Sequence, residues 1–458
     1  MQTFDAIIIG AGQAGPALAS RLTAAGMSVA FVERHLFGGT CVNTGCTPTK
    51  AMVASAYAAH IARRAAEYGV QLSGPVTVDM KALIARRESI VASSRTSVEQ
   101  SLRTNPKVTV FTGTGAFDSP NTVRVGDNLL TAPKIFLNVG ARASVPELPG
   151  VHTVPFLTNS SLLALETLPK HLVIVGGSYI GIEFGQMYRR FGAEVTIIEK
   201  APRLVSHEDE DASAAVLSIL EAEGIHVRLK AECITLAPHA EGISAGVDCE
   251  DGDPAIIGSH VLLAVGRTPN TQDLGLDKAG ITPDARGYIP VDDQCRTSVA
   301  GIWAIGDCNG RAAFTHTAYN DFEIVAANIL DNDPRRISDR ITCYAMYMDP
   351  PLARIGLTEQ QVRATGKPAL IATRPMTRVN RAREKGESLG FMKVLVDAES
   401  KQILGASLLG VGCDEAIHCL LDIMYAKAPY TTITRAVHIH PTVSELIPTL
   451  LESLQPLT

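Results

Sequence analysis

The chain has 458 residues, of which 46% are hydrophobic and 19% are charged, with a formal net charge of −6. At ~100–200 residues per domain, this length predicts two to four domains, and the 41 basic against 47 acidic residues argue against nucleic acid as a main partner. No apolar run approaches the ~18–20 residues that span a bilayer, and the N-terminus lacks a secretory pattern. The nine cysteines are too thinly spread to form the disulfide framework of a secreted protein. We therefore expect a cytoplasmic enzyme without membrane contact.

The first predicted unit covers residues 4–33, with an apolar strand, a Gly-rich turn, an Ala-rich helix and a second strand that ends in Glu33. Gly10, Gly12 and Gly15, with an acid 23 positions after the first of them, match the fingerprint of a dinucleotide-binding βαβ unit. There the glycines permit a tight turn, a close approach to a pyrophosphate and close packing of helix on strand. The pyrophosphate lies at the helix N-terminus, where free N–H groups favour an anion.

Two cysteines follow in GGTCVNTGCTPTK, with four residues between Cys41 and Cys46. A straight helix separates such positions by ~7.5 Å, beyond the ~4.4–6.8 Å between the Cα atoms of a disulfide, so a bridge needs the bend that Gly45 permits. If a helix begins near Cys46, its N–H groups lower the thiol pKa, and Lys50 lies one turn later on the same face. We favour a redox-active disulfide; the alternatives are two reduced cysteines or half of a zinc site, for which His35 is the only nearby further ligand.

The fingerprint recurs in residues 171–199, where Glu199 again lies 23 positions after the first glycine, Gly176. Two copies at one spacing predict two dinucleotide sites. Ser178 occupies the middle glycine position and Gly181 the third. We interpret Ser178 as a tolerated small residue; the alternative is a weaker or displaced nicotinamide site.

The remaining segments predict a mixed fold. Apolar positions three and four apart predict helices, and β-branched runs between turns predict strands. The expected elements are long helices within 47–105, with the periodic spacing clearest at 51–69 and 80–102, strands within 107–150, 226–236 and 259–266, a loop at 266–270, strands with a hairpin from 341 to 410, and helices from there to the end. This alternation favours α/β units followed by an α+β unit.

Seven motifs along essentially the whole chain resemble the class I pyridine nucleotide–disulfide oxidoreductases, a family that includes dihydrolipoamide dehydrogenase, glutathione reductase and mercuric reductase. The motifs are GAGQAG, GGTCVNTGCTPTK, FLNVGARASVPELPG, GGSYIGIE, AVGRTPN, TSVAGIWAIGD and HPTVSE. The resemblance implies a homodimer, FAD and a nicotinamide as cofactors, and an α/β fold with two Rossmann-like dinucleotide-binding domains and a C-terminal α+β dimerisation domain. The expected division is FAD-binding segments 1–150 and 271–340, an NAD(P)-binding segment 151–270 and an interface segment 341–458.

The resemblance also implies which residues hold the cofactors. The first fingerprint and Glu33 would bind the ADP part of FAD, and Asp307 its ribityl chain. Glu199 would accept a bond from a free ribose 2′-OH and repel a 2′-phosphate, which favours NADH, although Lys200 and Arg203 keep NADPH possible. The other expected cofactor-binding positions are Gly39, Thr40, Lys50, Gly140, Gly176, Ser178, Tyr179, Gly181, Glu183 and Gly266.

The same resemblance implies catalytic roles around the cysteine pair. Cys41 would exchange with substrate, and Cys46 would lie beside the flavin. Lys50 would lie near the flavin and pair with Glu183. Tyr179 would cover the nicotinamide pocket, the alternative being an aromatic ring that packs at the start of a helix.

The C-terminal HIHPTVSELIP contains a candidate acid–base pair. Pro441 disfavours helical geometry at His440, so we expect this ring on an extended segment before a helix. Thr442 and Glu445 fit a capping box, whereas the resemblance implies that Glu445 orients His440, supplied by the partner subunit, to move the proton of a substrate thiol. His438 is interpreted as a packing or surface residue.

We compare three functions for this set of residues. A histidine–glutamate pair favours reduction of a small disulfide, or oxidation of a dithiol. The alternative is a metal-ion reductase of the mercuric or copper-reducing kind, although no cysteine pair for Hg²⁺ follows Cys419; a redox sensor without catalysis is the third. Cys413, His418 and Cys419 are scattered over helix faces, so we interpret them as packing residues.

Overall fold

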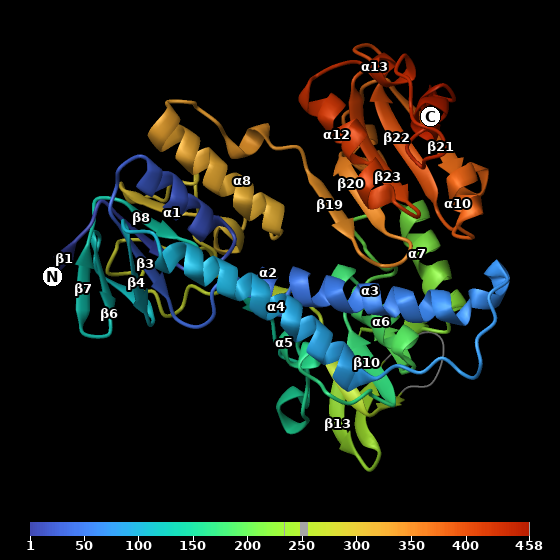
Figure 1. Ribbon diagram of the computed structural model, residues 1–458, viewed down its shortest axis with the longest axis horizontal. Helices are drawn as coiled ribbons and strands as arrows, with labels where there is room; N and C mark the ends of the chain where they lie inside the picture. Colours follow the sequence, from blue (N-terminus) through green and yellow to red (C-terminus); the bar gives the residue numbers. More distant parts are fainter. Residues whose placement is uncertain (233, 248–254, 458) are drawn as a thin grey trace.

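The computed structural model describes residues 1–232, 234–247 and 255–457, and its first unit is a five-stranded parallel sheet in the order β18-β8-β2-β3-β4 (Figure 1). Its strands are β2 (Ala6–Ile9), β3 (Val29–Glu33), β4 (Val108–Thr112), β8 (Ile135–Leu137) and β18 (Ile302–Ala304). β18 comes from the segment after residue 270, so the chain returns to complete this sheet.

Both faces of this sheet are covered. Ile8 and Phe31 pack in one buried cluster with α1 (Ala14–Ala24) and α8 (Thr315–Ala326), while Ile7 and Ile9 pack in another on the opposite face. Alternate residues of a strand point to opposite faces, and burial on both sides explains the continuous apolar run in β2. The second cluster includes residues of a mixed sheet formed by β1 (Gln2–Thr3), β5 (Gly115–Ser119), β6 (Thr122–Val125) and β7 (Asn128–Thr131).

The cysteine segment forms α2 (Gly39–Thr44) and α3 (Cys46–Arg63). A Cβ at Gly45, between the two helices, would lie 2.8 Å from the Thr40 carbonyl oxygen, so this close approach requires glycine. The helix expected from residue 47 begins at Cys46, and it ends at Arg63, before a short 3₁₀ turn over Ala65–Tyr68. The neighbouring α4 (Met80–Arg103) matches the expected 80–102 closely, and Asp79 caps it.

The second unit is a four-stranded parallel sheet, β12-β11-β10-β16. Its strands are β10 (His171–Val175), β11 (Glu194–Ile198), β12 (His226–Arg228) and β16 (His260–Leu263). Its helices are α5 (Asn159–Leu163), α6 (Tyr179–Phe191) and α7 (Glu210–Ala222). The same unit contains an antiparallel sheet of β13 (Thr235–His239), β14 (Gly242–Gly246) and β15 (Ala255–Gly258). Instead of one strand over 226–236, β12 ends at Arg228 and β13 begins at Thr235. The loop expected at 266–270 contains β17 (Arg267–Pro269), paired with β9 (Ala141–Ala143).

The third unit is a six-stranded antiparallel sheet in the order β19-β20-β23-β22-β21-β24, which lies above α3 in Figure 1. Its elements are β19 (Cys343–Met346), β20 (Leu352–Gly356), α9 (Glu359–Ala364), β21 (Ala369–Pro375), α10 (Asn380–Glu384), β22 (Phe391–Asp397), β23 (Ile403–Leu409), α11 (Cys413–Ala416), α12 (His418–Tyr425), α13 (Thr431–Thr434), α14 (Leu446–Leu451) and β24 (Gln455–Pro456). The expected hairpin is β22–β23. The predicted combination of α/β units with a C-terminal α+β unit is confirmed.

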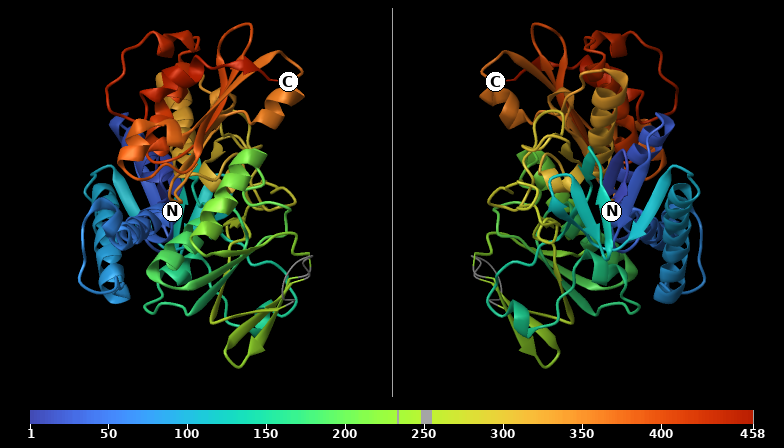
Figure 2. Two further views of the ribbon diagram at one scale, coloured as in Figure 1. Left: turned by 90° about the vertical axis from the view of Figure 1, so that its right-hand side faces the viewer. Right: turned by 90° about the vertical axis from the view of Figure 1, so that its left-hand side faces the viewer.

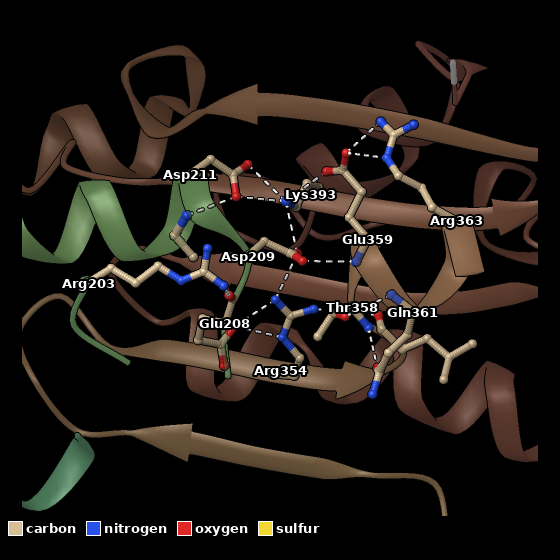
Figure 3. A network of polar contacts seen from close by, with 12 residues as sticks. Arg203, Glu208, Asp209, Asp211, Arg354, Thr358, Glu359, Gln361, Arg363 and Lys393 are labelled. Atoms are coloured by element: carbon tan, nitrogen blue, oxygen red, sulfur yellow. Dashed lines mark hydrogen bonds and ion pairs between the residues drawn. The ribbon is translucent and has the colours of Figure 1, made fainter. Parts of the chain in front are cut away.

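The three units pack against one another, as the side views show (Figure 2). Where the second unit meets the C-terminal sheet, Arg354 and Lys393, each 1% exposed, bind carboxylates just before and within α7 (Figure 3). Within the described ranges, no helix is both long enough and apolar enough to cross a membrane.

Candidate active site

One cavity of about 910 Å³ collects residues from all three units. This volume is at the upper end of the ~300–1,000 Å³ typical of small-molecule and cofactor sites. The predicted site residues that line it are Gly10, Gly12, Glu33, Gly39, Thr40, Cys41, Cys46, Lys50, Gly140, Tyr179, Glu183 and Asp307. The predicted residues outside its lining are Gly15, Gly176, Ser178, Gly181, Glu199, Gly266, His440 and Glu445.

The first fingerprint turn is held by Glu33, the last residue of β3. Both carboxylate oxygens of Glu33 accept backbone hydrogen bonds at 2.7 Å, one from the N–H of Ala11 and one from that of His35. Gly10 has a φ of +106°, and a Cβ there would lie 2.2 Å from the Asn138 carbonyl oxygen. The Asn138 side chain donates to the carbonyls of Gly10 and Gly12 at 3.0 Å each. The turn is thus ordered by contacts within the protein and presents bare backbone to the cavity.

The second fingerprint repeats this geometry. Glu199 accepts from the N–H of Gly177 at 2.6 Å and from that of Ala201 at 2.7 Å. The third glycines also correspond, because a Cβ at Gly181 would lie 2.0 Å from the Gly176 oxygen, and one at Gly15 would lie 2.5 Å from the Gly10 oxygen. The side chain of Ser178 is exposed and makes no capping bond to α6, so nothing in the packing opposes a small residue there.

The two cysteines are free thiols in this structure. The neighbouring Cys41 side chain lowers the pKa of Cys46 to about 6, and the Thr315 hydroxyl and the charge of Lys50 act in the same direction, against the effect of burial. The neighbouring Cys46 and burial raise the pKa of Cys41. Of the two, Cys46 is thus the thiol that ionises more readily, as expected at a helix N-terminus beside a lysine.

The expected pair of Lys50 and Glu183 is present. The Lys50 ammonium donates to a Glu183 oxygen at 2.7 Å, and the other oxygen accepts from the N–H of Tyr347 at 2.8 Å. The Lys50 ammonium also lies 4.7 Å from the centre of the Tyr347 ring. Glu183 is 4% exposed, so these contacts compensate a buried charge.

Asp307 lies at the cavity wall opposite an arginine that we did not predict. Burial raises the pKa of Asp307, and the ion pair with Arg267, at 3.2 Å, opposes that rise. Arg267 also donates to the Ala141 carbonyl at 2.6 Å, while its buried Nε has no hydrogen-bond partner. Arg267 and Asn138 lie within motifs already recognised in the sequence, AVGRTPN and FLNVG, so the signal for both was present.

An aromatic group covers the other end of the cysteine site. The Tyr179 ring packs on Phe314, with the ring centres 5.7 Å apart, and both rings line the cavity. The Thr315 hydroxyl lies 3.3 Å from the sulfur of Cys46. No local pattern in the sequence pointed to Phe314 or Thr315.

His440 and Glu445 are paired but lie away from the cavity of their own chain. The Nδ1 atom of His440 lies 2.9 and 3.1 Å from the two oxygens of Glu445, and the histidine side chain is 72% exposed. The Glu445 N–H donates to the Thr442 hydroxyl at 3.2 Å. Thr442 thus makes its capping bond, while the Glu445 carboxylate contacts His440. His438 contacts only the carbonyl of Ala436 among the described contacts.

The C-terminal cysteines lie in the packing of their own unit. Cys413 is buried in the core of the third unit, and burial raises its pKa to about 12. Cys419 donates to the Ala416 carbonyl at 3.1 Å, and His418 is exposed. Across the part of the chain that the structure describes, no three His, Cys, Asp or Glu side chains are placed to hold a metal ion together.

Comparison with known proteins identifies relatives over the whole length. The family described as pyridine nucleotide-disulphide oxidoreductase matches residues 4–321, and the dimerisation domain of that family matches residues 342–451. The probable pyridine nucleotide-disulfide oxidoreductase RclA of Escherichia coli (strain K12) is 35% identical over 453 residues, covering 97% of this chain and 98% of that protein. The dihydrolipoyl dehydrogenase of Chlamydia pneumoniae is 32% identical, covering 97% of this chain and 95% of that protein.

A solved structure shows the same architecture. It is described as the Cu(II) complex of the HOCl-induced flavoprotein disulfide reductase RclA from Escherichia coli. Its TM-score is 0.90 at 33% sequence identity, and the superposition covers 99% of each chain. The likeness therefore extends across all three units.

We predict that Cys46 of the reduced protein is a thiolate at neutral pH and loses its charge as the pH falls through about 6. Lys50→Met removes the neighbouring positive charge and should raise that pKa by about one unit. The measurement is the rate at which iodoacetamide alkylates Cys46 as a function of pH, followed by peptide mass. Lys107→Met, on the exposed surface, is the control, and a wild-type thiol that ionises near the ordinary ~8.5 would contradict the prediction.

Proposed function

The chain belongs to the pyridine nucleotide–disulphide oxidoreductase family, flavoenzymes that use FAD and a pyridine nucleotide, and we propose that it passes electrons from NADH through FAD to the Cys41–Cys46 pair and on to a small disulfide. One observation carries this proposal: the cysteine pair, with one thiol of low pKa, lines the same cavity as the first dinucleotide turn. Run in reverse, the same site would oxidise a dithiol.

The residues around the cavity fit FAD. The turn at Gly10 and Gly12 presents free backbone at the start of α1, where a pyrophosphate binds. Asp307 lines the same cavity and can accept hydrogen bonds from a polyhydroxyl chain. When bound there, FAD would supply the step that converts a hydride from the nicotinamide into an electron pair for the disulfide.

The chain's own residues would then perform thiol exchange. The Cys41 thiol loses its proton to His440 of the partner subunit, and its sulfur attacks the substrate disulfide, forming a mixed disulfide and releasing a thiolate that takes up this proton. Cys46 next attacks the Cys41 sulfur, releasing the second thiolate, which is protonated from solvent, and re-forming the Cys41–Cys46 disulfide. One NADH and one proton thus reduce one disulfide to two thiols.

The proposed domain boundaries lie near residues 150, 270 and 340. The parallel sheet that carries the first fingerprint takes its strands from before 150 and after 270, and the second fingerprint lies between. The match of residues 342–451 to a dimerisation domain supports a homodimer. In such a homodimer the exposed His440 would complete the cavity of the other subunit, because it does not line its own.

The surroundings of the second fingerprint support NADH over NADPH. Glu199 keeps a carboxylate at the end of β11, where a 2′-phosphate would bring further negative charge. Arg203, one of the two cations that could bind such a phosphate, is already engaged with Glu210 at 3.1 Å and with the carbonyl of Ser206 at 3.2 Å.

The second candidate function is reduction of a metal ion. The observation in its favour is that the solved structure of RclA is described as a Cu(II) complex. In this chain the Cys41 and Cys46 sulfurs would be the ligands for such a substrate.

The thiol relay predicts a spectroscopic signature. Anaerobic titration of the FAD-loaded protein with NADH should produce a long-wavelength absorbance from the contact of the Cys46 thiolate with the flavin, and Cys46→Ser should abolish it. Cys419→Ser, remote from the cavity, should retain it. A wild-type flavin that is only bleached, with no long-wavelength band, would show that the electrons do not pass through this pair.

The nucleotide preference can be tested at one residue. We expect kcat/KM to favour NADH, and Glu199→Gln to reduce the NADH-to-NADPH ratio by about tenfold, since loss of one charge contact is worth about that factor. Glu194→Gln, on the exposed start of the same strand, is the matched control. An unchanged ratio in Glu199→Gln would remove this carboxylate from the choice.

The two candidate substrates differ in their need for a proton. His440→Ala should lower kcat/KM for lipoamide and glutathione disulfide by ~10²–10⁴-fold, the usual contribution of a general acid–base group, and should leave reduction of Cu²⁺ or Hg²⁺ nearly unchanged. His438→Ala serves as the neighbouring control. If metal turnover greatly exceeds disulfide turnover in the wild type, the second function replaces the first.

A further inference from the structure

Tyr344, on β19 of the C-terminal sheet, contacts both other units. Its hydroxyl donates to a Glu208 oxygen at 2.5 Å. Its ring stacks on Phe314, with the ring planes 4° apart and the centres 5.4 Å apart. Glu208 lies just before α7 of the second unit, and Phe314 lies directly before α8 of the first. One side chain therefore links the three units beside the cysteine cavity.

The Glu208 end of this link is rigid. Arg354 donates from Nε to the second Glu208 oxygen at 2.7 Å and also binds Asp209 at 2.9 Å, and Lys393 binds Asp209 at 2.9 Å (Figure 3). Glu208 is 4% exposed and Arg354 1% exposed. Charge-assisted bonds in a close-packed interior hold a carboxylate in one position, so Glu208 is a fixed anchor for the Tyr344 hydroxyl.

At its other end, the contact of Tyr344 with Phe314 lies next to the redox thiol, Cys46. Thr315 follows Phe314 directly, and its hydroxyl lies 3.3 Å from the Cys46 sulfur. The next residue, His316, also stacks on Phe314, with the ring planes 13° apart, and its Nε2 lies 2.7 Å from the Cys343 carbonyl oxygen. β19 thus contacts the start of α8 at two points, Phe314 and His316. These contacts fix the position of the Thr315 hydroxyl, which lies between them in the sequence.

We propose that Tyr344 is a positioning residue for the cysteine pair: anchored on Glu208, it fixes Phe314 and thereby keeps the Thr315 hydroxyl on the sulfur of Cys46. This inference rests on the proposed role of Cys46 as the redox thiol. A hydroxyl held at hydrogen-bond distance stabilises the thiolate. Without the anchor the ring and the hydroxyl lose their fixed position, and Cys46 ionises at a higher pH.

Other groups also act on the charge of Cys46, and the variants must leave them in place. They are Cys41 on α2, Lys50 on α3 with its partner Glu183 on α6, Tyr179 at the start of α6, and Tyr347 after β19. The titratable His316 follows Thr315 on α8 and contacts the Cys343 carbonyl. Tyr344→Phe changes none of them and keeps the stacked ring. It removes only the bond to Glu208, which remains bound to Arg354.

The test is a double-variant cycle in FAD-loaded protein carrying Cys41→Ser, so that Cys46 titrates without its partner. The readout is the pH dependence of Cys46 alkylation by iodoacetamide. We expect Thr315→Val to raise the pH midpoint by about one unit, and Tyr344→Phe to raise it in the same direction by about half a unit. Because both act through one hydroxyl, Tyr344→Phe should add nothing when Thr315→Val is already present.

Tyr57→Phe is the matched control, since its hydroxyl also binds a carboxylate of the C-terminal unit, that of Glu387, from the same helix that begins with Cys46. It should keep the parent midpoint. A parent midpoint in Tyr344→Phe, or shifts that add fully in the double variant, would overturn the proposal. A midpoint at the ordinary ~8.5 in the protein that keeps Cys41 would instead contradict the role proposed for Cys46, because Cys41 is the main group that lowers this pKa, so the two failures are distinguishable.

Discussion

The buried charge of Glu183 is the constraint around which the site is arranged. A carboxylate that is 4% exposed needs a partner, and Lys50 and the N–H of Tyr347 supply it. Lys50 lies one turn after Cys46 on α3, and Glu183 lies one turn after Tyr179 on α6. Compensating this one charge therefore brings α3, which begins with the redox thiol, α6 of the second fingerprint and the segment after β19 to the same cavity.

The local parts of the site could be predicted from the sequence because local spacing determines their geometry. A strand, a glycine turn and a helix place Gly10 and Glu33 together within one unit, and the same spacing places Gly176 beside Glu199. The start of a helix at Cys46 also follows from its neighbours, since Gly45 permits the bend. The pairing of Lys50 with Glu183 could be stated only through the family resemblance.

The contacts between units could not be predicted in this way. Tyr344 and Glu208 are far apart in the chain, and neither position has a periodic pattern that would indicate the other. Arg354 stands in an apolar strand, where a charged residue is unexpected until the partner carboxylates are seen. Such pairs form only when the folded units pack against one another. A single sequence therefore shows the residues but not which of them are in contact.

The two fingerprint turns have a further consequence for the binding of dinucleotides. Glu33 and Glu199 each use both oxygens to hold backbone N–H groups of their own turn. The conformational entropy of each loop is therefore lost when the protein folds, and a dinucleotide that arrives later meets a receptor already in shape. Ordering of these two loops therefore does not weaken binding, and the conformational entropy lost there on association is that of the ligand.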